Sequence, residues 1–202
     1  MSSPALPGRN AAAASSAASA AAATPAAAPR YSGGAIALHW LHAVLVLALI
    51  GIGLAMGEMP KGAERSAAIA LHKSLGLLAL ALFALRLGWR LRHRPPADTR
   101  LGALERKLAG LGHRALYLLL LLTPLAGYLS SSFTPYPMRF FGIVIPKAGW
   151  PDEGWNAVFN ALHTGCAWTL IALIALHLGA VVLHALSGQS VLGRMLPRRG
   201  GR

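Results

Sequence analysis

The chain has 202 residues, of which 55% are hydrophobic and 12% are charged. A soluble domain carries about 25% charged residues, so this composition indicates an integral membrane protein. Lysine and arginine outnumber acidic residues by 19 to 6 and give a net charge of +13. Because these charges flank apolar segments, we interpret them as a topology signal and expect no nucleic-acid partner.

Residues 1–30 are dominated by alanine and serine, with Pro25 and Pro29 near the end of the run. Residues 10–30 contain no leucine, isoleucine, valine or phenylalanine, so the run matches the apolar core of a signal peptide only weakly. We interpret it as a disordered tail. Residues 31–197 then form a single membrane domain, and residues 198–202 form a basic C-terminal tail.

Four apolar segments are expected to span the membrane as helices, at residues 35–56, 67–89, 114–132 and 156–186. When the spans alternate in direction, one side holds Arg9, Arg30, Arg86, Arg90, Arg92, Arg94, Arg100, Arg106, Lys107, Arg114, Arg194, Arg198, Arg199 and Arg202. The other side holds only Lys61, Arg65, Lys73, Arg139 and Lys147. The four spans and the positive-inside rule therefore predict an all-α, multi-pass four-helix membrane bundle with both termini cytoplasmic.

The segments between the spans have distinct compositions. The run from Arg90 to Pro96 ends the second span, and a short amphipathic piece through Leu108 is expected to lie at the cytoplasmic headgroups. The segment from Ser130 to Trp155 is rich in proline and aromatic residues, which predicts a cover over the outer mouth of the bundle. The single cysteine, Cys166, lies in an apolar span and is expected to be a buried packing residue.

Four histidines lie at matched depths in three of the spans. His39 and His177 lie toward the inner side, and His72 and His163 lie toward the outer side. Fourteen helical residues place His163 and His177 on nearly one face, roughly 21 Å apart. Two imidazoles that face each other across a bundle can bind an iron porphyrin axially. A closed zinc site is less natural, because it usually needs four ligands.

The other histidines are weaker candidates. His42 follows His39 by one turn and is its main competitor for ligation, whereas His93 is expected to be solvated. His113 opens the third span, where an interfacial role is expected. His184 shares a face with His177 near the inner surface, where it could contact a quinone or a heme propionate.

Short motifs along the chain resemble the bacterial cytochrome b561 family from Tyr31 to Pro197. Their order and spacing carry the resemblance. They are Leu38-His39-Trp40-Leu41, His72-Lys73-Ser74-Leu75-Gly76, Gly112-His113-Arg114-Ala115-Leu116-Tyr117, Leu162-His163, His177, His184 and Leu192-Gly193-Arg194-Met195-Leu196-Pro197.

The resemblance implies two b-type hemes, the inner one held by His39 and His177 and the outer one by His72 and His163. It also implies a quinone-linked oxidoreductase of the bacterial inner membrane that moves electrons between a periplasmic reactant and membrane quinone. Some members of the family are similar to superoxide oxidases, which pass electrons from superoxide to ubiquinone. His42 is an extra histidine beside the family motif.

On this interpretation, cationic residues at the outer side steer an anion such as superoxide toward the outer heme; they are Lys73, Arg139 and Lys147. At the inner side, His184 and Arg114 are expected to hydrogen-bond quinone oxygens and relay protons. The partners are then membrane lipid, quinone and the periplasmic reactant, with a second copy of the chain or a redox partner protein left open. Two other functions also stay open: a cytochrome b anchor subunit of a separate dehydrogenase or hydrogenase, and a non-redox metal-binding membrane bundle.

Overall fold

The computed structural model describes residues 30–93, 102–187 and 192–196. Four long helices dominate these residues: α2 (Gly33–Glu58), α3 (Ala63–Arg92), α4 (Ala103–Ser132) and α5 (Glu153–Leu186). All four are long and apolar enough to cross a membrane, so the expected all-α class with four spans is confirmed. The tails predicted at residues 1–30 and 198–202 lie outside the described residues, apart from Arg30.

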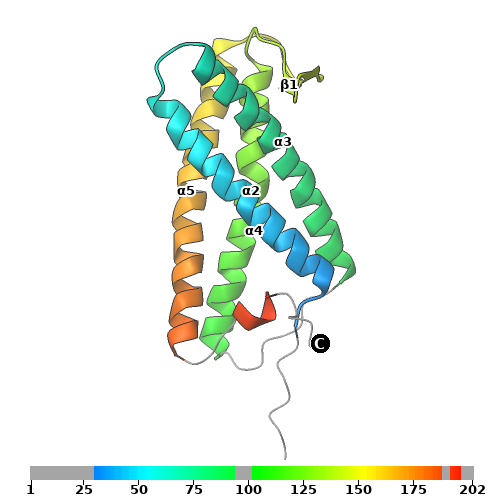
Figure 1. The fold of residues 1–202 in the computed structure, drawn as a ribbon, viewed down its shortest axis with the longest axis vertical. Coiled ribbons are helices and arrows are strands. Elements are labelled where there is room, and N and C mark those ends of the chain that lie inside the picture. The colour runs from blue at the N-terminus through cyan, green and yellow to red at the C-terminus, as the bar shows by residue number, and fades with distance from the viewer. Residues whose placement is uncertain (1–29, 94–101, 188–191, 197–202) are drawn as a thin grey trace, which may run out of the picture.

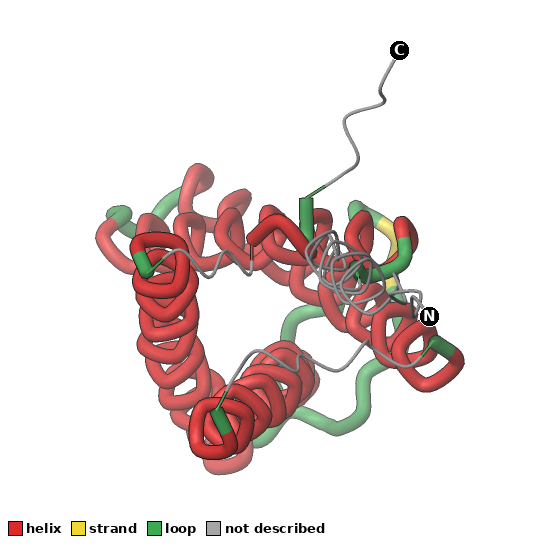
Figure 2. The backbone as a smooth tube through the Cα atoms, turned by 90° about the horizontal axis from the view of Figure 1, so that it is seen from below, coloured by secondary structure: helices red, strands yellow, loops and turns green. Residues whose placement is uncertain are grey.

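The four helices form two antiparallel hairpins. In Figure 1, α4 and α5 stand upright, while α2 and α3 cross the view obliquely. The helix α2 packs along α3, α4 packs along α5, and the two hairpins meet mainly where α3 contacts α4. Seen from below in Figure 2, the helices stand around a common central region. Side chains of α2 and α3 can therefore face those of α5 across the bundle.

Local capping residues set where the helices begin. The Ser32 hydroxyl accepts a hydrogen bond from the Ala35 amide at 3.4 Å, and the Asp152 carboxylate accepts one from the Trp155 amide at 2.9 Å. Both bonds satisfy amides that have no partner within the first turn of a helix. Only four residues, Met59–Gly62, connect α2 to α3, so these two helices must lie side by side.

The helix that contains the third span begins before the span that the sequence predicts. The helix α4 starts at Ala103, so residues up to Leu108 belong to this helix and do not form a separate amphipathic piece. His113 lies ten residues inside α4 and therefore does not begin the helix. The apolar pattern begins only near residue 114, because the preceding turns of α4 carry the charged residues 105–107. A helix that extends beyond the hydrocarbon region tolerates such charges at its end.

Few side chains are buried between the helices, and most large apolar side chains face outward. The buried apolar side chains are Ile36, Val46, Ala79, Leu82, Phe83, Ala126, Met138, Cys166 and Leu170. The prediction that Cys166 is a buried packing residue is thereby confirmed. The exposed leucines, such as Leu47, Leu85 and Leu118, suit a surface that lipid chains cover.

The segment between α4 and α5 folds back onto the bundle as a short hairpin. Strand β1 (Arg139–Phe140) pairs antiparallel with β2 (Ile143–Val144). The connecting Phe141 and Gly142 have φ angles of 47° and 90°, the positive values that two-residue hairpin turns require. The Phe141 amide donates a hydrogen bond to the Ser74 hydroxyl of α3 at 3.0 Å. This segment therefore covers one end of the bundle, here called the hairpin end.

The opposite end brings the two ends of the described chain together. The short helix η1 (Leu192–Arg194) lies against the start of α2. The Arg30 guanidinium donates to the Gly193 carbonyl at 3.0 and 2.6 Å, and the Trp40 indole donates to the Met195 carbonyl at 2.8 Å. We call this end the termini end.

Candidate functional site

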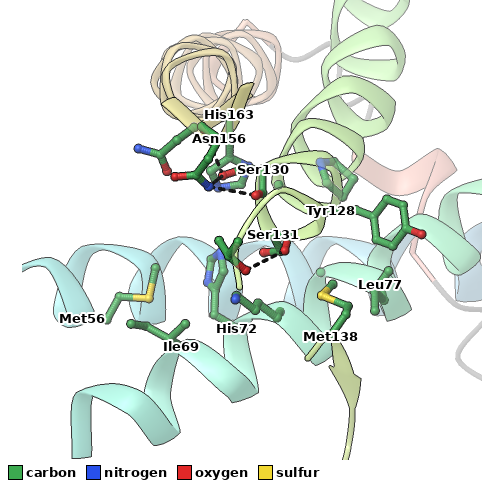
Figure 3. Close-up of a pocket in the computed structure, with 16 residues that line it drawn as sticks. Met56, Ile69, His72, Leu77, Tyr128, Ser130, Ser131, Met138, Asn156 and His163 are labelled. Carbon is green, nitrogen blue, oxygen red and sulfur yellow. Dashed lines mark hydrogen bonds between the residues drawn. The ribbon is translucent and has the colours of Figure 1, made fainter. Parts of the chain in front are cut away.

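An opposed pair of histidines lies at the hairpin end. His72 projects from α3 and His163 from α5, and their ring centroids are 6.1 Å apart with an interplanar angle of 89°. Figure 3 shows the two rings converging from opposite helices. The structure therefore brings together the two residues that the sequence assigned to one outer site.

The hydrogen bond made by His163 prepares this ring for a metal. Its Nδ1 lies 2.8 Å from the Thr123 carbonyl, which can only accept, so the ring proton is on Nδ1. The lone pair of Nε2 is then free to bind iron, which is the usual second-shell arrangement of ligating histidines. The His72 ring lies beside the Leu49 carbonyl, but its buried Nδ1 makes no well-aligned hydrogen bond within the described residues.

The spacing of the His72 and His163 rings fits an axially ligated heme. A metal lies about 2 Å from a ligating imidazole nitrogen, and half the width of each ring adds about another ångström. Two imidazoles on one iron therefore have centroids about 6 Å apart, close to the separation in the structure. Within the described residues, no group of three or more histidine, cysteine or acidic side chains could hold a metal ion. A heme needs only two protein ligands, because the porphyrin supplies the others.

Two glycines allow the helices to approach these rings closely. A Cβ atom at Gly127 would lie 2.9 Å from Nδ1 of His163, and a Cβ atom at Gly53 would lie 3.3 Å from Cε1 of His72. The first distance is a clash, and the Thr123 hydrogen bond holds the His163 ring in place.

The Gly127→Ala variant is therefore expected to displace His163 and weaken heme binding at the hairpin end about tenfold or more. Heme content per chain, measured by pyridine hemochrome after purification at limiting heme, reports this loss. Gly51→Ala is the matched control, because a Cβ atom there meets nothing within 4 Å. Equal heme content in the two variants would contradict the expectation.

A cavity of about 290 Å³ surrounds the hairpin-end pair. It is lined by apolar residues of α2 and α3, by the α4 segment around Pro124, by polar residues of α4 and α5, and by Met138 before β1. The labelled lining residues in Figure 3 are Met56, Ile69, His72, Leu77, Tyr128, Ser130, Ser131, Met138, Asn156 and His163. Nine of the sixteen lining residues have polar side chains, so the cavity can bind a ligand that has both apolar and polar parts.

The three cations expected near this site differ in their positions. Lys73 lines the cavity, and its ammonium has no hydrogen-bond partner among the described residues. Lys147 lies within electrostatic range of Lys73 and donates a short hydrogen bond to the Thr134 carbonyl. Arg139 is exposed on the hairpin, where it donates to the Gly142 carbonyl at 3.3 Å, and it does not line the cavity. The structure thus brings Lys73 and Lys147 to the site and leaves Arg139 at the surface.

A second group of histidines lies toward the termini end. His39 of α2 lies within electrostatic range of His177, His113 and His42. The rings of His113 and His177 are 5.7 Å apart between centroids, and Nδ1 of His113 donates to the Ala109 carbonyl at 2.6 Å. The predicted pair His39 and His177 is therefore joined by His113, which the sequence had assigned to the interface.

Arg86 is the residue at this site that the sequence did not identify. Its Nη2 donates a hydrogen bond to Nδ1 of His39 at 2.9 Å, and its guanidinium lies over the Tyr117 ring at 5.2 Å. Arg90 packs on the same ring at 5.2 Å. Arg86 had been counted only as one of the charges that set topology. Its position one turn before Arg90, still inside the apolar run, was the signal that could have distinguished it.

The remaining candidates have different surroundings. His42 is 1% exposed, and neither of its ring nitrogens has a hydrogen-bond partner among the described residues. His184 lies half-buried in the last turns of α5, and Arg114 is exposed on α4. The structure shows no hydrogen bond from either of these side chains to another described residue, so it does not bring them together as a site.

Opposed imidazoles inside an apolar four-helix bundle are the arrangement of membrane b-type cytochromes. Comparison with known proteins gives the same class. The family model described as prokaryotic cytochrome b561 matches residues 30–198, and the chain therefore belongs to the prokaryotic cytochrome b561 family. Membership makes it a multi-pass membrane protein and implies heme and electron transport.

Two curated relatives cover most of the chain. Cytochrome b561 homolog 2 of Escherichia coli strain K12 is 34% identical over 178 residues, which cover 83% of this chain and 91% of the relative. The probable superoxide oxidase CybB of Yersinia pestis is 27% identical over 174 residues, which cover 85% of this chain and 98% of that protein.

Proposed function

We propose that this protein is a di-heme cytochrome of the bacterial inner membrane that transfers electrons from periplasmic superoxide to ubiquinone. The observation that carries the proposal is the opposed pair His72 and His163, whose rings lie 6.1 Å apart and of which His163 has its Nδ1 proton fixed by a hydrogen bond; these two residues would hold one heme. His39 and His177 would hold the second heme. When bound, each heme supplies one-electron redox chemistry.

The hairpin end is the proposed periplasmic side. Support comes from the charge bias, because most basic residues belong to segments at the termini end and few belong to the hairpin end. The chain would then have both termini in the cytoplasm, with the His72 and His163 pair near the periplasm. A reactant that arrives from the periplasm would meet this pair first.

The proposed reaction balances electrons and protons. Two superoxide anions each give up one electron and become molecular oxygen, and one ubiquinone takes up two electrons and two protons to become ubiquinol. Lys73 would attract the anion, since its ammonium lines the cavity beside His72 and lacks a hydrogen-bond partner among the described residues. Superoxide as the substrate is suggested by the relative named as a probable superoxide oxidase.

The quinone is proposed to bind at the termini end. His184 and Arg114 would hydrogen-bond its oxygens and pass protons from the cytoplasm, because His184 lies beyond His177 toward that end of α5 and Arg114 is next to His113 on α4. This part of the proposal rests on their positions along the two helices.

Three measurements on the purified protein test the proposed function: its heme content, its reduction by superoxide and its reduction of a quinone. The detergent-purified protein is expected to contain two b-type hemes per chain, to be reduced by superoxide and to reduce a soluble ubiquinone analogue without any added protein. Two hemes that superoxide fails to reduce would favour the anchor subunit of a separate dehydrogenase or hydrogenase. A colourless protein, made with ample heme supply, would overturn the cytochrome assignment.

Lys73→Gln is expected to lower the second-order rate constant for reduction by superoxide about three- to tenfold at low ionic strength, because it removes a cation that lines the same cavity as His72. The same variant should flatten the dependence of that rate on salt. Stopped-flow reduction at several salt concentrations measures both. Lys61→Gln is the control, since this exposed lysine lies between α2 and α3 and does not line the cavity. Equal rates for the two variants would show that Lys73 does not attract the substrate.

A further inference from the structure

The hydrogen bond between Arg86 and His39 conflicts with iron ligation by His39 as the ring stands. A guanidinium only donates, so Nδ1 of His39 accepts from Nη2 of Arg86. A neutral imidazole has one proton, which must then be on Nε2. In that tautomer, Nε2 has no lone pair for a metal. The ring of His163 shows the opposite tautomer, with the proton on Nδ1.

Ligation through Nε2 therefore requires Arg86 to leave His39. Once Nδ1 carries the proton, two donors would face each other, and Arg86 must find another acceptor. The Tyr117 hydroxyl lies where it can accept a hydrogen bond from Arg86, and no carboxylate of the described residues is among the groups that interact with this guanidinium. The N–H group that leaves His39 therefore needs a further acceptor beside Tyr117.

His42 has the properties that such an acceptor needs. Its side chain is 1% exposed, and both ring nitrogens lack a hydrogen-bond partner among the described residues. A fully buried ring with neither nitrogen bonded is rare and calls for a partner that another arrangement supplies. His42 lies one helical turn from His39, and Arg86 is within electrostatic range of both rings. A rotation of the Arg86 side chain could thus move its hydrogen bond from the His39 ring to the His42 ring.

We propose that His42 is the second acceptor for Arg86: the guanidinium donates to His39 in the structure and to His42 when His39 ligates the inner heme. His42 is then a positioning residue that acts through Arg86 and does not bind iron. This inference rests on the proposed function, in which His39 and His177 hold a heme. It also gives a role to the histidine that the sequence left as a competitor of His39.

The consequence is measurable as the rate at which heme is lost from the termini-end site. In the His42→Phe variant, Arg86 has no second acceptor and stays hydrogen-bonded to His39. The affinity of that site for heme is therefore expected to fall about tenfold. Transfer of heme from the purified holoprotein to excess apomyoglobin resolves this as a faster phase for one of the two hemes. His42→Asn retains an acceptor oxygen and is expected to behave within about twofold of the wild type.

A double-mutant cycle separates this role from simple packing. Arg86→Met removes the donor, so adding His42→Phe to it should produce no further acceleration of heme loss. A packing role would make the effects of His42→Phe equal in both backgrounds and would make His42→Asn as harmful as His42→Phe; either result overturns the inference. If His42 ligates iron, His42→Phe abolishes the inner heme in both backgrounds, which also overturns it.

The proposed function is judged separately, by the heme content of the wild type. Suppose that the wild type holds two hemes per chain and that the effects of His42→Phe and Arg86→Met on heme loss simply add. This result would reject the role of His42 and leave the cytochrome assignment intact. A wild type that lacks the inner heme would reject both.

Discussion

His163→Ala is expected to lower the heme content from two to one per chain. The variant removes the ring whose Nδ1 is fixed by the Thr123 carbonyl and whose centroid lies 6.1 Å from that of His72. Among the described residues, no other histidine ring contacts His72, so a substitute ligand is not at hand. Pyridine hemochrome quantification and the reduced-minus-oxidised spectrum measure the change, and the α-band amplitude per chain should fall by about half.

Substitution of the other histidine of the pair, His72, gives a second test of the same assignment. His72→Ala should lose the same heme, and the double variant His72→Ala/His163→Ala should lose no more than either single variant, because two ligands of one iron act as a unit. His93→Ala is the control, since its ring stacks on Trp89 at 4.4 Å at the exposed end of α3. Two hemes in His163→Ala, or none in the double variant, would contradict the assignment of this pair to one site.

His177→Ala is expected to remove the other heme, whereas His113→Ala should retain both. The two rings are close, but they project from α4 and α5, which are packed neighbours in the bundle. His39 projects from α2, which faces α5 across the bundle. His113 should therefore affect the heme only as a neighbour of the ligand, with a shift in midpoint potential.

Redox titration with heme quantification distinguishes the two variants. The double variant His163→Ala/His177→Ala should be colourless, because each substitution removes a different heme. His184→Ala, also on α5, is the control and is expected to keep two hemes. Loss of a heme from His113→Ala with full retention in His39→Ala would reassign the inner ligand from α2 to α4.

The long-range pattern of the sequence predicted the fold better than local details did. Four apolar runs and the depths of His39, His72, His163 and His177 were enough to predict four helices and two groups of histidines, because helical rise and membrane thickness are fixed. The start of α4 was predicted too late, since hydropathy follows the hydrocarbon region, whereas a helix can continue beyond it.

Contacts between helices could not be predicted from spacing along one helix. The hydrogen bond from Arg86 to His39 joins residues 47 positions apart, and the approach of Gly127 to His163 depends on how α4 and α5 pack. The β1–β2 hairpin was missed because a two-residue strand has no periodicity to detect. The position of Arg139 on that hairpin, away from the cavity, follows from the same irregular segment.

The division of the bundle into two helical hairpins has a consequence for assembly of the protein. On the proposed ligand sets, each iron joins one histidine of the α2–α3 hairpin to one of α5, so each cofactor fastens the two halves together. Direct contact between the halves is limited mainly to α3 and α4. Ligand binding that occurs only in the folded state adds its free energy to folding. Heme supply in the cell would then set how much of the newly inserted chain becomes a closed bundle and how much is left for membrane proteases.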